Sequence, residues 1–307
     1  MSDSYYSRRD RWSTRAVEWI QFATAWIMRW ITWPIPTWVL SGLLAPIGGG
    51  LMMALPSIRR RALDNLALVW PEMPMARRRQ IARCAARQFI RLGVEYARLD
   101  KFVREMQLNV AGAEHLHQAV DAGKGAILVS AHFGNWEAAR LAAMREGAET
   151  GIIYRAFNNR YLDQFTMDLI PCAGNPVLQK GRQGMRQLVA HVARGGFVMI
   201  LVDQRNSGAP YLDFMGHPAE TVTAAADLAA RAGAALIPAR AVRNVAKRSF
   251  DVQFEAPVAG DDSAAMMQEV NDRIGAWVED FPEQWFWFHR RWRQTWKSRG
   301  QPGGPAS

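Results

Sequence analysis

Cysteine is scarce in this chain of 307 residues, and the spacing of the two present excludes several kinds of site. Cys84 and Cys172 lie 88 residues apart, without a CxxC pair and without a Cys/His pairing at zinc-site spacing. Two cysteines also cannot build the disulfide framework of a small secreted domain. We therefore expect two unpaired thiols in a reducing compartment.

Acidic side chains are outnumbered, with 28 Asp and Glu against 38 Lys and Arg, for a net charge of +10. About half of the residues (49%) are hydrophobic, 21% are charged, and no long segment has low complexity, which excludes a disordered chain, a collagen and a coiled coil. Charges recur at ordinary globular spacing over most of the length, which excludes a polytopic transporter. The length suits one large domain or two modest ones.

Charge is absent from residues 30–58, a stretch long enough to cross a bilayer, which takes about 20 apolar residues. Four prolines and the glycines at 48–50 interrupt it, so the pattern predicts two helices, at about 15–33 and 37–54. Tryptophan recurs and arginine flanks both ends, as is typical of the lipid headgroup layer. We predict that residues 1–58 anchor the chain to a membrane as a broken element; helices that cap a soluble core are the alternative.

The remaining chain divides into a predicted α/β domain at 59–299 and a disordered tail at 300–307. Residues 59–107 are predicted to be helical, with a turn at Pro71 and Pro74 and an arginine-rich face. That face is either solvated or docks an acidic partner or phospholipid headgroups. Strand-like runs with almost no charge inside, at 125–131, 151–155, 197–203 and 235–242, then alternate with helices, which predicts a mostly parallel sheet flanked by helices. Residues 251–258 alternate in the manner of an edge strand.

The segment with the clearest chemistry follows the strand at 125–131. His132 ends the strand, Gly134 indicates a turn, and Asn135 is a good N-cap for a helix whose first turn contains Glu137. From such a turn the Glu137 carboxylate can reach back to His132, and a His held by a carboxylate is a general base. Because GxSxG, HExxH and GxxxxGK[ST] motifs are all missing, we expect a base that activates an external hydroxyl without a covalent enzyme intermediate.

This segment, His132-Phe-Gly-Asn-Trp-Glu137, is similar to the HxxxxE block of the late lipid A acyltransferases (lauroyl and myristoyl transferases). The mycobacterial phosphatidylinositol mannoside acyltransferases belong to the same superfamily. Other blocks resemble the family in the same order over about residues 60–295: 65–73, Tyr154-Arg155, Gly181-Arg182, Asp203-Gln204-Arg205, 213–221 and 282–292.

The resemblance implies a glycerol-3-phosphate acyltransferase-like α/β fold and an O-acyltransferase of the HxxxxE type. His132 would deprotonate the acceptor hydroxyl and Glu137 would orient His132. The hydroxyl would attack an acyl thioester, usually on acyl carrier protein, so no metal and no cofactor beyond this co-substrate is expected. The expected substrate-binding residues are Arg155, Arg182, Asn135, Asp203 and Gln204.

Arginine suits anionic groups such as acceptor phosphates, although ordinary ion pairing is the alternative for Arg155 and Arg182. The expected acceptor is a lipid A precursor, at the cytoplasmic face of the bacterial inner membrane. Another anionic glycolipid, such as a phosphatidylinositol mannoside, is the alternative within the class. A non-catalytic basic protein that binds membranes or nucleic acid is the alternative class.

The aromatic and basic residues near the C-terminus bear on whether the protein meets a membrane or a nucleic acid. Tryptophan, phenylalanine and arginine interleave from Trp285 to Arg299, and such a strip suits either nucleic-acid stacking or a membrane interface. Because a membrane anchor is expected at the other end of the chain, we favour the membrane and expect no nucleic-acid partner.

Overall fold

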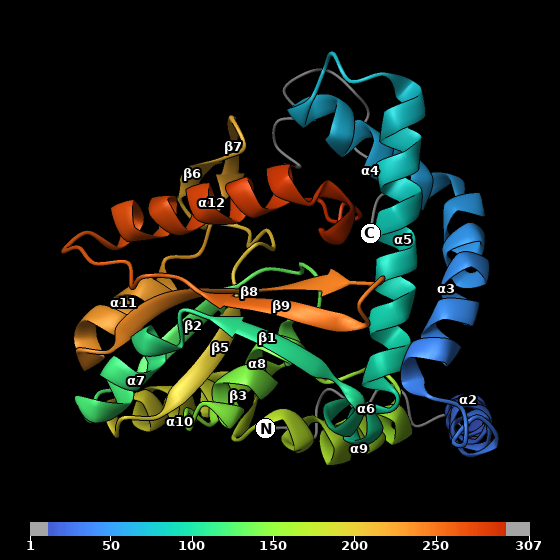
Figure 1. Cartoon of the computed structure of the whole chain (residues 1–307), viewed down its shortest axis with the longest axis horizontal. Helices are drawn as coiled ribbons and strands as arrows, with labels where there is room; N and C mark the ends of the chain where they lie inside the picture. Colours follow the sequence, from blue (N-terminus) through green and yellow to red (C-terminus); the bar gives the residue numbers. More distant parts are fainter. Residues whose placement is uncertain (1–11, 293–307) are drawn as a thin grey trace.

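The computed structural model describes residues 12–292, and a seven-stranded sheet lies at its centre (Figure 1). The strand order is β1-β9-β8-β2-β5-β3-β4. The bounds are β1 Gln107–Ala111, β2 Ala126–Ser130, β3 Thr150–Tyr154, β4 Val177–Gln179, β5 Phe197–Leu201, β8 Ala235–Asn244 and β9 Ser249–Phe254. Strands β8, β2, β5, β3 and β4 are parallel, whereas β9 pairs antiparallel with β8 and parallel with β1. The expected mostly parallel α/β sheet is confirmed.

Two strand predictions need correction. Strand β9 lies between β1 and β8, so the expectation of an edge strand at 251–258 is wrong. The true edge at this side is β1, whose five residues alternate between exposed and half-buried positions, and this short strand was not predicted. A separate antiparallel hairpin, β6 (Tyr211–Phe214) and β7 (His217–Glu220), packs on α12.

Helices cover both faces of the sheet, because successive strand side chains point to opposite faces. In β2, Leu128 joins the core formed with α7 (Ala113–Asp121) and α8 (Trp136–Arg145), and Ile127 joins the core on the other side. That second core includes α10 (Arg182–Ala193), α11 (Ala224–Ala232) and α12 (Ser263–Asp280). The 3-10 turn η2 (Ile170–Ala173) packs against α8, and α9 (Arg160–Leu169) leads into this turn. Strand β2 is therefore buried on both faces, and its carboxyl end opens on the site described below.

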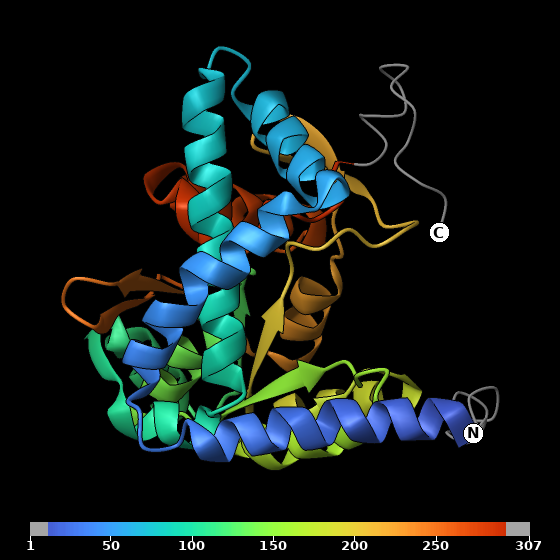
Figure 2. The same ribbon diagram turned by 90° about the vertical axis from the view of Figure 1, so that its right-hand side faces the viewer.

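Residues 12–105 form a helical arm at one side of the sheet (Figures 1 and 2). Its helices are α2 (Trp12–Ile31), α3 (Thr37–Ala54), α4 (Pro56–Val69), α5 (Met75–Tyr96) and α6 (Leu99–Glu105). The expected helices at about 15–33 and 37–54 are confirmed, and α3 continues through Pro46. Glycine allows α3 to approach α5 closely, since a Cβ on Gly49 would lie 3.0 Å from Arg87. Figure 2 shows α2 lying across the foot of α3 and α5.

Apolar side chains remain exposed along this arm. On α2 they include Trp19, Trp26 and Trp30, and on α3 they include Leu43, Ile47 and Leu51, which are 60–67% exposed. By length and composition α3 could cross a membrane, and a third of it is buried in the protein. Membrane anchoring by these helices stays a prediction.

The C-terminal segment lies inside the protein. After α12, the turn η3 (Pro282–Gln284) packs against α5. The rings of Trp285, Trp287 and Trp292 that follow are at most 1% exposed. The interpretation of this segment as a surface strip is therefore wrong for the part that the structure describes, while Trp296, Arg299 and the predicted tail lie outside it.

Candidate active site

His132 and Asp203 follow two neighbouring parallel strands at the same level. In the register of β2 and β5, Ser130 pairs with Leu201, and each site residue comes two positions later. His132 Nδ1 lies 2.8 Å from Asp203 Oδ1, and the His132 backbone N–H donates to Asp203 Oδ2 at 2.9 Å. The strand order thus brings together two residues that are 71 positions apart in the sequence.

The Asp203 carboxylate is fully buried and ionised. The indole N–H of Trp285 also donates to its Oδ2 at 2.9 Å. Burial alone would raise the pKa of Asp203, but the charge and hydrogen bonds of His132 hold it well below its usual range. An ionised carboxylate can only accept, so the Nδ1 atom of His132 has to donate the proton between them.

This tautomer leaves His132 Nε2 as the basic nitrogen. Gln204 follows Asp203 directly, and its side-chain Nε2 lies 3.0 Å from His132 Nε2, where it donates to the lone pair. The imidazole is about one-fifth exposed, whereas Asp203 is fully buried. The site therefore has the arrangement of a general base, with a buried anion behind an imidazole whose second nitrogen faces outward.

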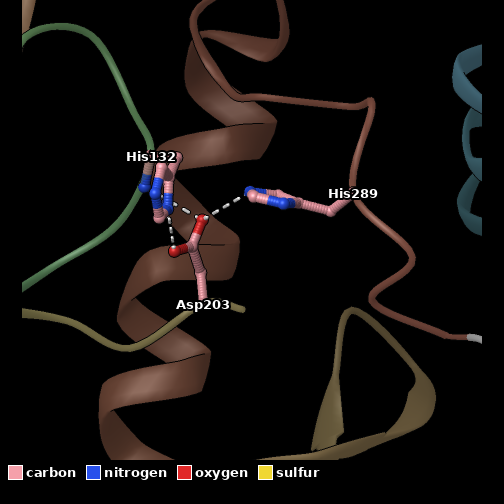
Figure 3. Close-up of side chains that lie close together, drawn as sticks. All are labelled: His132, Asp203 and His289. Carbon is pink, nitrogen blue, oxygen red and sulfur yellow. Dashed lines mark hydrogen bonds and ion pairs between the residues drawn. The ribbon is translucent and has the colours of Figure 1, made fainter. Parts of the chain in front are cut away.

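His289 lies on the other side of the same carboxylate, as Figure 3 shows. Its Nε2 is 3.7 Å from Asp203 Oδ2, and its ring centroid is 4.9 Å from that of His132. Burial lowers the pKa of His289 from 6.5 to about 4, with Asp203 opposing this shift and His132 adding to it, so His289 is neutral at pH 7. Sequence reasoning assigned His289 to the C-terminal block but gave it no role.

The ligand atoms of His132, Asp203 and His289 all lie within 4.8 Å of one another, so these three could hold a metal ion. The 2.8 Å separation of His132 Nδ1 and Asp203 Oδ1 is that of a direct hydrogen bond. Two ligands of a tetrahedral zinc ion, each ~2.0–2.1 Å from the metal, stand farther apart, at about 3.3 Å. The distances as they stand therefore favour a hydrogen-bonded pair.

Glu137 does not contact His132, and this corrects the expected bond between them. It is completely buried in the first turn of α8, where its Oε2 lies 2.5 Å from Arg140 and its Oε1 accepts from the Tyr96 hydroxyl. Arg140 in turn donates to the carbonyls of Thr150 and Gly174. The carboxylate that holds His132 is Asp203. Glu137 is linked to the site through Tyr96, which accepts from the indole of Trp136 beside the His132 ring.

Asn135 is buried and uses both ends of its amide. Its oxygen caps α8 by accepting from Glu137 N at 2.9 Å, as expected, and its Nδ2 donates to Glu95 Oε2 at 2.8 Å. Glu95 is also paired with the guanidinium of Arg243 on β8. The structure therefore gives Asn135 a positioning role beneath the His132 turn, and its expected contact with substrate stays a prediction.

Gly134 lets this turn sit directly on β8. Its φ is +54°, a conformation that side chains disfavour, and a Cβ there would lie 1.8 Å from the Ala241 carbonyl oxygen. On the other side of the turn, the Gly134 N–H donates to Gln284 O and the Phe286 N–H donates to His132 O. The C-terminal segment thus forms one wall of the site.

Arg155 and Arg182 follow the carboxyl ends of two neighbouring strands, at the end of the sheet where His132 and Asp203 also lie. Arg155 follows β3, the neighbour of β5, and Arg182 opens α10 after β4, the next strand along. Both side chains are exposed. Neither contacts His132 in the part of the chain that the structure describes, and their expected contact with substrate stays a prediction.

The recess beside His132 is small and mostly apolar. Its volume is about 20 Å³, enough for one water molecule. Phe89 of α5 and Phe286 form part of its lining, and their ring centroids lie 4.7 Å apart.

The family model described as bacterial lipid A biosynthesis acyltransferase matches residues 8–294. The chain belongs to this family. The chain is similar to the lipid A biosynthesis palmitoleoyltransferase of Escherichia coli (strain K12), at 25% identity over 296 residues and 90% of each chain. It is 23% identical to the lipid A biosynthesis acyltransferase of Haemophilus influenzae over 238 residues, which make up 75% of this chain and 74% of that protein.

A second group of relatives has a different acceptor in its name. This chain is 26% identical over 204 residues to the phosphatidylinositol mannoside acyltransferase of Mycobacterium tuberculosis. The match spans 62% of the length of that protein and 62% of this chain. The resemblance drawn from the sequence blocks is thus confirmed.

Proposed function

We propose that this protein transfers a fatty acyl chain from an acyl thioester, carried by acyl carrier protein, to a hydroxyl of a lipid A precursor. The observation that carries the proposal is the outward-facing Nε2 of His132, backed by the buried Asp203 carboxylate. Membership of the lipid A acyltransferase family supports the reaction class.

In the proposed reaction, the acceptor hydroxyl donates to His132 Nε2, the position that the Gln204 amide occupies in this structure. The hydroxyl oxygen attacks the thioester carbonyl carbon as its proton moves to Nε2. The carbon–sulfur bond then breaks, and the departing sulfur takes the proton from the imidazolium to leave as a thiol. Asp203 stabilises the imidazolium between these steps, and neutral His289 adds no competing positive charge.

The apolar recess supports the proposal of an acyl substrate, and the two arginines at the carboxyl ends of β3 and β4 support the proposal of an anionic one. Phe89 and Phe286 would have to separate for a chain to reach His132, because the recess holds only about 20 Å³. Arg155 and Arg182 would bind acceptor phosphates or the phosphopantetheine phosphate of the donor through planar, permanently charged guanidinium groups. Glu137 and Asn135 would hold α8 and the His132 turn in place.

The exposed apolar faces of α2 and α3 support a place at the membrane. We propose the cytoplasmic face of the bacterial inner membrane, where the catalytic domain would meet both a soluble acyl carrier and a lipid acceptor. The mycobacterial relatives favour a second acceptor, a phosphatidylinositol mannoside or a similar anionic glycolipid.

Mass spectrometry of lipids separates these acceptors. Lipids from cells with and without the protein would be compared, with the His132→Ala variant as control. We expect one lipid to gain the mass of an acyl chain only with the wild type, and the parent mass names the acceptor. Equal acylation by His132→Ala would contradict the proposed mechanism, and unchanged lipids in all three samples would contradict the proposed function.

A further inference from the structure

A groove of about 650 Å³ lies on the helical arm, on residues that are not part of the His132 recess. It is bordered by the second half of α3, the start of α4 and the first half of α5 (Figure 1). Four arginines line it: Arg59, Arg79, Arg83 and Arg87. Its volume falls within the usual range of small-ligand sites.

Three of these arginines form one row on α5. Arg79, Arg83 and Arg87 are four residues apart, so they stand on one face of the helix, where like charges repel. All three are exposed, and within residues 12–292 none of them has an ion pair or hydrogen bond. Other arginines of the same helix do have partners, as Arg78 does with the Trp70 carbonyl.

The groove also has no negative charge of its own. None of its lining residues is acidic. Arg59 donates one guanidinium N–H to the Met53 carbonyl at 3.1 Å, and this acceptor carries no net charge. A concentrated positive charge without internal carboxylates is complementary to an external anion.

The opposite wall of the groove is apolar and continuous with the exposed face of α3. Gly50 and Ala54 line the groove. They come seven residues, or two turns, after Leu43 and Ile47, which are 60% and 61% exposed. A molecule with its anionic group among the arginines could therefore lay an apolar chain along this side of α3.

We propose that this groove binds an anionic phospholipid of the membrane, such as phosphatidylglycerol. The phosphate lies among Arg79, Arg83 and Arg87, and the acyl chains follow the exposed leucine and isoleucine side chains of α3. A lipid fits better than an acidic protein because the arginines adjoin a long apolar stripe. The inference is independent of the proposed reaction.

Such a site would fix the position of the catalytic recess relative to the bilayer. Helix α5 provides both, since Arg87 lines the groove and the next two residues, Gln88 and Phe89, line the recess beside His132. A lipid held at one point of α5 would thus set the depth and orientation of the other.

The test is binding of the full-length protein to vesicles of phosphatidylcholine alone and of phosphatidylcholine with phosphatidylglycerol. We expect the wild type to prefer the anionic vesicles, and the triple variant Arg79→Gln, Arg83→Gln, Arg87→Gln to lose at least tenfold of that preference. The control Arg77→Gln, Arg186→Gln, Arg194→Gln removes the same charge from exposed arginines outside the groove and should keep most of the preference.

A single substitution gives a second, independent readout. A Cβ on Gly50 has no atom within 4 Å, so Gly50→Glu places a carboxylate in the groove without a clash, and Gly50→Gln is its neutral match. Gly50→Glu should lower the preference for anionic vesicles and Gly50→Gln should not. Thermal unfolding of each variant checks that the fold is retained.

Two outcomes would overturn the proposal. Equal loss in the two triple variants would mean that only total charge matters. Unchanged vesicle preference in the groove variant, together with weaker binding to acyl carrier protein, would assign the arginines to that protein. Acyl transfer to a detergent-dispersed acceptor tests the reaction separately and should persist in the groove variant.

Discussion

Trp285 donates its indole N–H to the same Asp203 oxygen that accepts from the His132 backbone, at 2.9 Å in each case. One carboxylate therefore links the turn after β2 to the C-terminal segment. Because Asp203 is fully buried, each of these donors helps to keep it ionised and fixed in direction. The orientation of the His132 imidazole thus depends on residues far apart in the sequence.

Asp203→Asn tests this dependence. The amide keeps the size of the side chain but can donate an N–H to His132 Nδ1. This favours the tautomer with its proton on Nε2, which cannot accept the proton of the acceptor hydroxyl there. We expect kcat to fall by about 10³- to 10⁴-fold with little change in KM, as measured in an acyl-transfer assay. Asp261→Asn, at an exposed position, serves as a control and should leave kcat unchanged. Retention of more than about a tenth of kcat by Asp203→Asn would show that another group orients the base.

Glu137→Gln should act on stability first. It leaves the Arg140 guanidinium buried without a counter-charge, which costs about 3–5 kcal/mol of unfolding free energy. Chemical denaturation in detergent would measure it. The double variant Glu137→Gln, Arg140→Met removes both charges and should recover part of the loss. An inactive Glu137→Gln protein of unchanged stability would instead restore Glu137 as a direct participant in catalysis.

The Glu137 contact shows what local sequence could and could not provide. The strand, the turn at Gly134 and the Asn135 cap follow from residue types alone, and the structure has all three. The predicted bond between Glu137 and His132 is wrong because Arg140, three residues after Glu137 on the same helix, binds the Glu137 carboxylate instead. The i, i+3 spacing of Glu137 and Arg140 on a predicted helix is itself a sequence signal for this ion pair.

The link between His132 and Asp203 could not be predicted in the same way. The hydrophobic pattern predicts that both residues lie at strand ends, but the bond between them needs β5 to be the neighbour of β2, and strand order is a tertiary property. Burial of the C-terminal tryptophans has the same origin. Their pattern of aromatic and basic residues is typical of a membrane interface, yet Arg291 is also buried and donates to the Glu220 carbonyl and the Thr221 hydroxyl.

Gly134→Ala should disable the site through the backbone. The new Cβ would overlap the Ala241 carbonyl oxygen, so the turn has to move away from β8 and carry His132 with it. Gly147→Ala is a matched control, since Gly147 also has a positive φ but its Cβ would meet nothing within 4 Å. We expect the control to cost only the conformational strain of about 1–2 kcal/mol and to keep its kcat. Similar activities for the two variants would contradict this role for the turn.

The pH dependence of stability should reveal the buried His289. Its pKa is about 4 in the folded protein and near 6.5 when unfolded, so between these values only the unfolded chain takes up the proton. Stability from this residue is therefore complete above about pH 6.5 and is lost as the pH falls toward 4, by roughly 3 kcal/mol in total. The measurement is the difference in unfolding free energy between wild type and His289→Asn at several pH values. A difference that stays constant from pH 7 to pH 4.5 would mean that His289 takes up its proton as readily in the folded protein as in the unfolded chain, and the lowered pKa of His289 would be wrong.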